Sequence, residues 1–132
     1  MTPGTAPTVR RVPLMAFDDL TGQFISLTTF RRDGTPVPTT VWFARGGDHI
    51  VVGTASEAGK VKRIRVNPEA TMERSNYRGK TKGGTIYAGS ARILDGDEAG
   101  RAHDALSGKY GWQWRLAGNR IETYLEISPD VG

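Results

Sequence analysis

Six short segments of strand character follow one another along this chain, and only two stretches of helical character separate them. The strand segments are rich in β-branched and aromatic residues and end at turns containing glycine, proline or aspartate; they cover residues 24–30, 35–43, 49–54, 70–75, 85–94 and 121–127. A βαβ series would alternate strands with helices, so the pattern argues against a doubly wound sheet. A closed antiparallel barrel fits better, because closure removes the exposed edges of a six-stranded open sheet.

The two helical segments are short. The first has apolar residues every three positions, begins at Ser56 as the expected cap, and ends before Pro68. The second is expected near residues 98–107, with Gly108 ending it. Residues 109–114 form an aromatic segment without a clear period. We therefore expect a mainly β (α+β) fold with two short helices.

Length and composition bound the class of protein. The 132 residues fit a single domain, 1–132, with residues 1–13 as a loosely ordered lead-in. The hydrophobic fraction of 37% is lean for one core, which favours an oligomer. The chain contains no cysteine, so we expect no disulfide, no thiolate metal site and a reducing, cytoplasmic location. No signal peptide is evident, and no segment approaches the roughly 20 apolar residues that cross a membrane.

Positive charge is concentrated in the first helical segment. The net charge is +4, and four cations lie within six residues, at Lys60, Lys62, Arg63 and Arg65. A helix start offers unpaired N–H groups and a positive dipole end, and the hydroxyls of Thr54 and Ser56 come just before it. This combination suits a phosphate group. A solvated amphipathic helix would explain the same charges equally well.

The segment from Pro36 to Trp42 contains two prolines, which cannot donate to a strand ladder. Its first half must therefore lie at an edge or in an irregular position. Freed backbone groups, with the hydroxyls of Thr39 and Thr40, would then face the polar edge of a planar ring, while Val41 and Trp42 pack. The simpler interpretation is an edge strand that proline protects from aggregation.

Other chemistries find little support. Tyr110, Trp112 and Trp114 form an aromatic cluster, which more often fills a core or an interface than stacks on a flat ligand. His49 and His103 have no partner at metal-ligand spacing, so no metal site is expected. Motifs for a nucleophilic serine, a zinc protease, a P-loop or a dinucleotide fold are absent. The residues therefore indicate a site for a planar, anionic molecule that brings its own chemistry, with no catalytic side chain.

Three blocks of the sequence resemble the pyridoxamine 5′-phosphate oxidase-like superfamily, specifically its F420-dependent class. The blocks are residues 24–43 (FISLTTFRRDGTPVPTTVWF), 59–68 (GKVKRIRVNP) and 89–92, and the likeness runs from about Leu20 to Ile127. The resemblance implies a six-stranded antiparallel split β-barrel of the FMN-binding type. It also implies a homodimer that binds two cofactors in grooves between the subunits.

The family pattern also assigns roles to particular residues. It implies that the cofactor ring is lined by Pro38, Thr39, Val41 and Trp42, and that the phosphate is held by Thr54, Ser56, Lys60, Lys62 and Arg63. Arg65 and Asn67 would flank the phosphate. Beyond the family pattern, we expect Trp112 of the neighbouring subunit to form a wall of the substrate pocket. The basic surplus favours coenzyme F420 over FMN, because F420 carries an oligoglutamate tail as well as a phosphodiester.

The expected activity is hydride transfer between F420 and an electron-poor small-molecule substrate. One alternative keeps the fold but binds FMN, as a flavin reductase or an oxidase of a phosphorylated pyridine. A second is an F420 carrier without turnover. A more remote alternative is a basic nucleic-acid-binding barrel. We expect neither nucleic acid nor membrane as a partner.

Overall fold

The computed structural model describes residues 9–10, 20, 22–46, 49–55, 58–76, 78, 80–81, 86–117, 121 and 123–129. Within these residues the main strands are β2 (Phe24–Phe30), β3 (Pro36–Gly46), β4 (His49–Thr54), β5 (Glu69–Ser75), β6 (Ile86–Leu94) and β7 (Thr123–Pro129). The helices there are α1 (Gly59–Val66), α2 (Gly96–Tyr110) and α3 (Trp112–Ala117).

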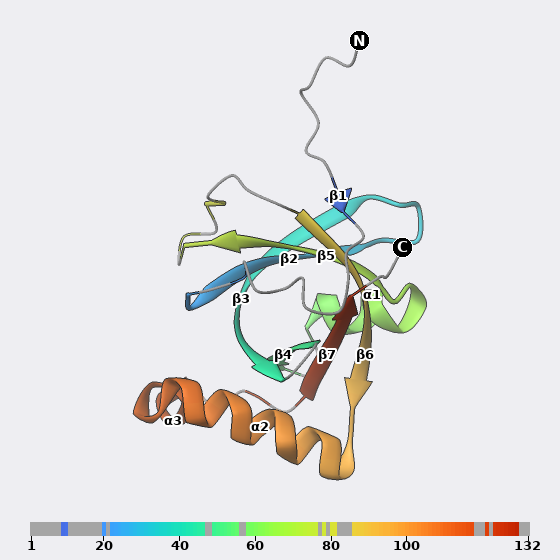
Figure 1. Ribbon diagram of the computed structural model, residues 1–132. Coiled ribbons are helices and arrows are strands. Elements are labelled where there is room, and N and C mark those ends of the chain that lie inside the picture. The colour runs from blue at the N-terminus through green and yellow to red at the C-terminus, as the bar shows by residue number, and fades with distance from the viewer. Residues whose placement is uncertain are drawn as a thin grey trace.

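The six main strands close into an antiparallel barrel. The strands pair in the order β2, β3, β4, β7, β6 and β5, and β5 pairs back with β2, so the ring of hydrogen-bonded strands is complete (Figure 1). The expected six-stranded split barrel is confirmed. A two-residue strand, β1 (Val9–Arg10), adds to β6 in parallel, and it lies within the segment expected to be a loose lead-in.

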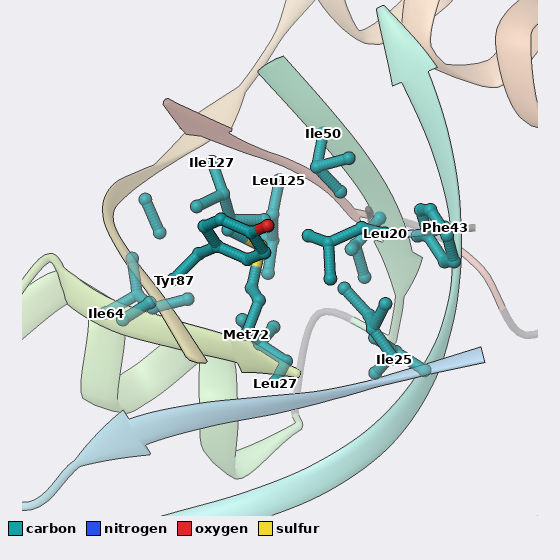
Figure 2. Packing of buried hydrophobic residues seen from close by; sticks show 14 residues of the cluster. Leu20, Ile25, Leu27, Phe43, Ile50, Ile64, Met72, Tyr87, Leu125 and Ile127 are labelled. Atoms are coloured by element: carbon teal, nitrogen blue, oxygen red, sulfur yellow. The ribbon is translucent and has the colours of Figure 1, made fainter. Parts of the chain in front are cut away.

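Hydrophobic residues pack on both faces of the barrel wall. The interior cluster includes Ile25, Leu27, Phe43 and Met72, which point toward one another in Figure 2. A second cluster lies between the sheet and the helices α2 and α3, which Figure 1 shows end to end across one end of the barrel. β4 is therefore buried on both faces: Ile50 and Val52 belong to the interior cluster and Val51 to the outer one.

The first helix begins later than the sequence indicates. Its N-cap is Ala58, which makes no side-chain capping hydrogen bond, and its first residue is Gly59. The expected cap Ser56 was therefore wrong, and this residue lies outside the described part of the chain. Val61 and Ile64 are the buried residues of α1, as their spacing predicts.

The expectation of two helices was also wrong. α2 continues past Gly108 to Tyr110 and stops at Gly111, whose φ of 59° suits glycine. The physical reason is that Leu106 and Tyr110 lie one turn apart on the buried face, so packing outweighs the glycine in the exposed part of the turn. The aromatic segment then forms α3, in which Trp114 is 3% exposed and Trp112 is 68% exposed.

Two glycine substitutions should change stability in opposite directions. A Cβ atom on Gly53 of β4 would lie 2.7 Å from Trp114 Cη2 and 2.8 Å from Ile121 Cγ2. We expect Gly53→Ala to lower the free energy of unfolding by about 1–3 kcal/mol through overpacking. Gly100 on α2 has open space around it, so Gly100→Ala should raise that free energy by about 0.5–1 kcal/mol through helix propensity. Urea denaturation measures both; a Gly53→Ala protein as stable as the wild type would contradict the packing described.

Candidate functional site

Two cations of α1 are held by threonine hydroxyls from the barrel. Lys60 Nζ donates a hydrogen bond to Thr54 Oγ1 at 3.2 Å, and Thr54 is the last residue of β4. Arg63 Nε donates to Thr29 Oγ1 at 2.6 Å, and Thr29 lies near the end of β2. Both hydroxyls are buried, with Thr54 7% and Thr29 0% exposed. The barrel wall therefore fixes these two side chains, which a solvated helix would leave free.

The start of α1 lies beside the Arg63 guanidinium. A Cβ on Gly59 would be only 2.8 Å from Arg63 Nη1, so the guanidinium packs against the first residue of the helix. The Val61 N–H already donates to the Ala58 carbonyl, so the backbone donors left at the helix start are the N–H groups of Gly59 and Lys60, for which the described residues show no acceptor; Ala58 makes no side-chain capping hydrogen bond. Backbone donors, the positive dipole end and two fixed cations thus converge at one place, which is the geometry that binds a phosphate or carboxylate.

The electrostatics of these cations favour an added anion. Burial lowers the pKa of Lys60, and the charge of Arg63 lowers it further. Burial also lowers the pKa of Arg63, with Arg31 as the second cause. No carboxylate among the described residues contributes to either shift. A bound anion would stabilise the charged forms of Lys60 and Arg63. We therefore expect an anion to bind here through charge-assisted hydrogen bonds.

The other residues predicted for this site, Lys62, Arg65 and Asn67, are exposed or have contacts of their own. Lys62 and Arg65 are exposed on α1. Asn67 is the C-cap of α1, where its N–H bonds to the Arg63 carbonyl and its Oδ1 accepts the Glu69 N–H at 3.0 Å. The structure therefore brings together Thr54, Lys60 and Arg63 from the predicted set; Ser56 lies outside the described residues.

The predicted ring-binding strand has an unpaired edge. The Tyr110 hydroxyl accepts the Phe43 N–H at 3.1 Å and lies 2.8 Å from the Gln23 carbonyl oxygen, so the backbone of Phe43 faces the β2 side. Backbone groups of alternate residues face opposite edges of a strand, so those of Thr40 face away from β2. β3 pairs with β4 only from Phe43 to Gly46. Within the described residues, the Thr40 N–H therefore has no strand partner.

The prolines follow the same alternation. Pro36 and Pro38 present their nitrogens to this unpaired edge, where a missing donor costs no ladder hydrogen bond. The expected edge position is thus confirmed. Side chains alternate as well: Thr39 and Val41 share the interior-facing side, where Val41 is 8% exposed and Thr39 Oγ1 donates to the Leu27 carbonyl at 3.2 Å.

The aromatic residues mostly pack against one another. Trp42 faces outward from the barrel, with its ring centroid 4.7 Å from that of Tyr110 and 6.0 Å from that of Trp114. Tyr110 and Trp114 are therefore core residues, as the more frequent use of such clusters predicts. Trp112 remains exposed on α3, and Trp42 is half-buried.

Sequence reasoning missed three residues of the site. Thr29 orients Arg63, Gly59 makes room for the guanidinium, and Arg31 adds positive charge near it. One signal was present for Thr29: it follows Ile25 and Leu27 in the alternation of β2, so a polar residue occurs on the inward face. The other two depend on how α1 packs on the barrel, which the local sequence does not specify.

Other types of site find no support in the described residues. No group of three His, Asp or Glu side chains there is placed to hold a metal ion. His49 Nε2 lies 3.4 Å from Glu126, and His103 Nδ1 lies 3.4 Å from Asp104. Across the same part of the chain, no helix has the length and apolar character needed to span a membrane.

Comparisons with known proteins bear on the fold. No protein-family model matches this sequence, and no curated protein is similar to it. Solved structures do match. The heme storage protein HutZ from Vibrio cholerae has a TM-score of 0.66 at 14% identity, over 83% of each chain. A heme-binding protein from Mycobacterium smegmatis has a TM-score of 0.63 at 16% identity, over 87% of this chain and 48% of that one.

A proposed pyridoxamine 5′-phosphate oxidase from Listeria innocua has a TM-score of 0.56 at 16% identity, over 83% of this chain and 85% of that one. At these identities the matches show a shared fold. The chain has the fold of these structures, including the one named as a proposed pyridoxamine 5′-phosphate oxidase, and this is the fold that the sequence blocks predicted. The relatives include heme-binding proteins as well as a proposed oxidase, so the fold leaves the ligand open.

The anion site makes a direct prediction for two arginines on one helix. Titration with inorganic pyrophosphate should show salt-sensitive binding to the wild-type protein. Arg63→Gln removes a fixed charged donor and should weaken binding about tenfold or more. Arg65→Gln removes an exposed charge from the same helix and should weaken binding by less than about threefold. Calorimetry measures both; equal losses in the two variants would show that only net charge matters.

Proposed function

We propose that this protein binds a flavin-type cofactor by its phosphate at the start of α1, with coenzyme F420 as the first candidate and FMN as the alternative. The observation that carries this proposal is the pair of threonine-held cations beside the uncapped helix start. The donor set fits the group: Lys60, Arg63 and the backbone N–H groups of α1 are all donors, as a phosphate requires. The exposed Lys62 and Arg65 would then meet a longer anionic tail.

The unpaired edge of β3 supplies a place for the ring. The Thr40 N–H faces that edge and would donate to a carbonyl oxygen of a flat heterocycle. Pro38 and Trp42 share the outward side of the strand and would pack against the ring. Thr39 and Val41 face the interior and would support the strand from behind.

In this proposal the protein positions a reaction that the cofactor supplies. Bound F420 would bring hydride transfer to or from an electron-poor small molecule. The residues of this chain would orient the ring, hold its phosphate and exclude water from the contact between the two reactants. No side chain needs to act as acid or base, because solvent can provide the proton.

A second copy of the chain would complete the groove. Among the residues that the structure describes, β3 pairs with β4 only from Phe43 onward, which leaves its edge from Pro36 to Trp42 without a partner there, and Trp112 exposes a large apolar surface on α3. In a homodimer Trp112 of the neighbouring subunit would form a wall of the substrate pocket. The cysteine-free sequence favours the cytoplasm as the location.

Cofactor titration separates the alternatives. The three tryptophans allow binding of F420, FMN and heme to be followed by fluorescence quenching. We expect F420 to bind tightest, Arg63→Gln to weaken it about tenfold or more, and the control Arg101→Gln, at an exposed position on α2, to leave it nearly unchanged. Tight FMN binding with no response to F420 would change the assigned cofactor to FMN. Heme is included because two structural relatives are heme proteins. Tight heme binding whose affinity is unchanged by Arg63→Gln would overturn the proposal.

Turnover requires its own measurement. Reduced F420 mixed with the protein and a set of electron-poor acceptors should be oxidised faster than in protein-free controls. Binding without oxidation by any acceptor would indicate a carrier. Oligonucleotide titration tests the alternative of a nucleic-acid-binding barrel. We expect oligonucleotides to bind weakly and without sequence preference.

A further inference from the structure

A second chemically distinctive place lies at the end of α2, away from the elements that form the phosphate site. Lys109, in the last turn of α2, lines a cavity of about 350 Å³. The walls are mostly apolar and come from the region before β2, from β3 and from α2: Leu20, Gly22, Phe43, Ala44, Arg45 and Ala105. A cavity of this volume is at the lower end of the range for small-molecule pockets.

The Lys109 amine is held in one position. Its Nζ donates to the Phe43 carbonyl oxygen at 2.8 Å and lies 3.7 Å from the centroid of the Phe43 ring. Phe43 itself is fully buried and anchored through its backbone to the Tyr110 hydroxyl. No carboxylate among the described residues pairs with this amine. The lysine is therefore fixed by a carbonyl and a ring, neither of which neutralises its charge.

The surroundings weaken the charged form of the amine. Lys109 is exposed as a residue, but partial burial of its amine lowers the pKa of Lys109 to about 8, and the charge of Arg45 contributes. The Phe43 ring and carbonyl both favour the ammonium form, whereas burial and the charge of Arg45 oppose it. A larger fraction of this amine is then neutral near pH 8 than in an ordinary lysine, which is almost wholly charged there.

We propose that Lys109 is a nucleophilic lysine that captures a small carbonyl compound carrying an anionic group, such as a 2-oxo acid or an aldehyde acid, as an imine in this cavity. The neutral amine can donate one N–H to the Phe43 carbonyl and keep its lone pair for attack. Arg45 lines the same cavity and provides positive charge for the anionic group. The inference stands apart from the cofactor site, which other residues form.

The chemistry is balanced without an oxidant or reductant. The Nζ lone pair attacks the carbonyl carbon, and the carbonyl oxygen takes up protons and leaves as water. The nitrogen loses its two protons, and a carbon–nitrogen double bond replaces the carbon–oxygen one. The apolar walls formed by Leu20, Phe43 and Ala105 would slow hydrolysis of the product.

Reductive trapping tests this proposal on the intact protein. Glyoxylate with sodium cyanoborohydride converts an imine into a stable carboxymethyl amine, which peptide mass mapping assigns to individual lysines. At pH 7.5 we expect Lys109 to react at least roughly tenfold faster than Lys62, which does not line this cavity, because the neutral fraction of the Lys109 amine is raised. The rate at Lys109 should level off above about pH 8.

Two comparisons make the result decisive. Propanal has no anionic group, so Lys109 should prefer glyoxylate over propanal by more than Lys62 does, and Arg45→Gln should reduce that preference. Lys109→Arg should remove the fast-reacting site and leave the labelling of other lysines unchanged. Labelling of Lys109 no faster than that of Lys62, or equal preference for the two aldehydes at both lysines, would overturn the proposal. Each readout on the wild-type protein holds even where a variant fails to fold.

Discussion

Closure of the barrel determines where the cations of α1 can lie. Hydrogen bonding around the full ring gives every strand one inward and one outward face, so Thr29 follows Ile25 and Leu27 into the interior. A buried hydroxyl needs a hydrogen-bond partner, and Arg63 Nε provides it at 2.6 Å. Thr54 ends β4 shortly before α1 begins, so its hydroxyl lies at the start of that helix, where Lys60 donates to it. The geometry of the cationic site is thus a consequence of the strand register, and the charges alone would not produce it.

This arrangement has an energetic cost that points to a ligand. Lys60 and Arg63 are partly withdrawn from water, which lowers the pKa of each; the charge of Arg63 lowers that of Lys60 further, and the charge of Arg31 lowers that of Arg63. Stability gained elsewhere, mainly from the two hydrophobic clusters, offsets that cost. An anion between the cations would remove part of the repulsion, and any ligand that binds only the folded state stabilises it. Stability and phosphate binding should therefore be coupled at this site.

Much of the fold could be predicted from the sequence, because strand patterns and turns are local. The six strands, the proline edge of β3 and the turn at Asp33-Gly34 all follow from residue types within a few positions of one another. The helices were harder. Packing of Tyr110 against β3 extends α2 beyond Gly108, and no local signal at Ser56 shows that α1 begins three residues later.

The site was only partly predictable for a similar reason. Cations at Lys60 and Arg63 were evident from their spacing, and helix geometry separates them from the exposed Lys62 and Arg65. The threonine from β2 is more than 30 residues away in the sequence, so only the closed barrel reveals it. Arg45 and Lys109 show the same limit, because the cavity between them is formed by elements that are distant along the chain.

A crystal structure of the protein grown with F420 tests the central claim most directly. The account predicts that the phosphate lies at the start of α1, within hydrogen-bond distance of Lys60 Nζ and the Arg63 guanidinium, with both threonine contacts retained. A phosphate that contacts only the exposed Lys62 and Arg65, or that lies elsewhere on the barrel, would contradict it.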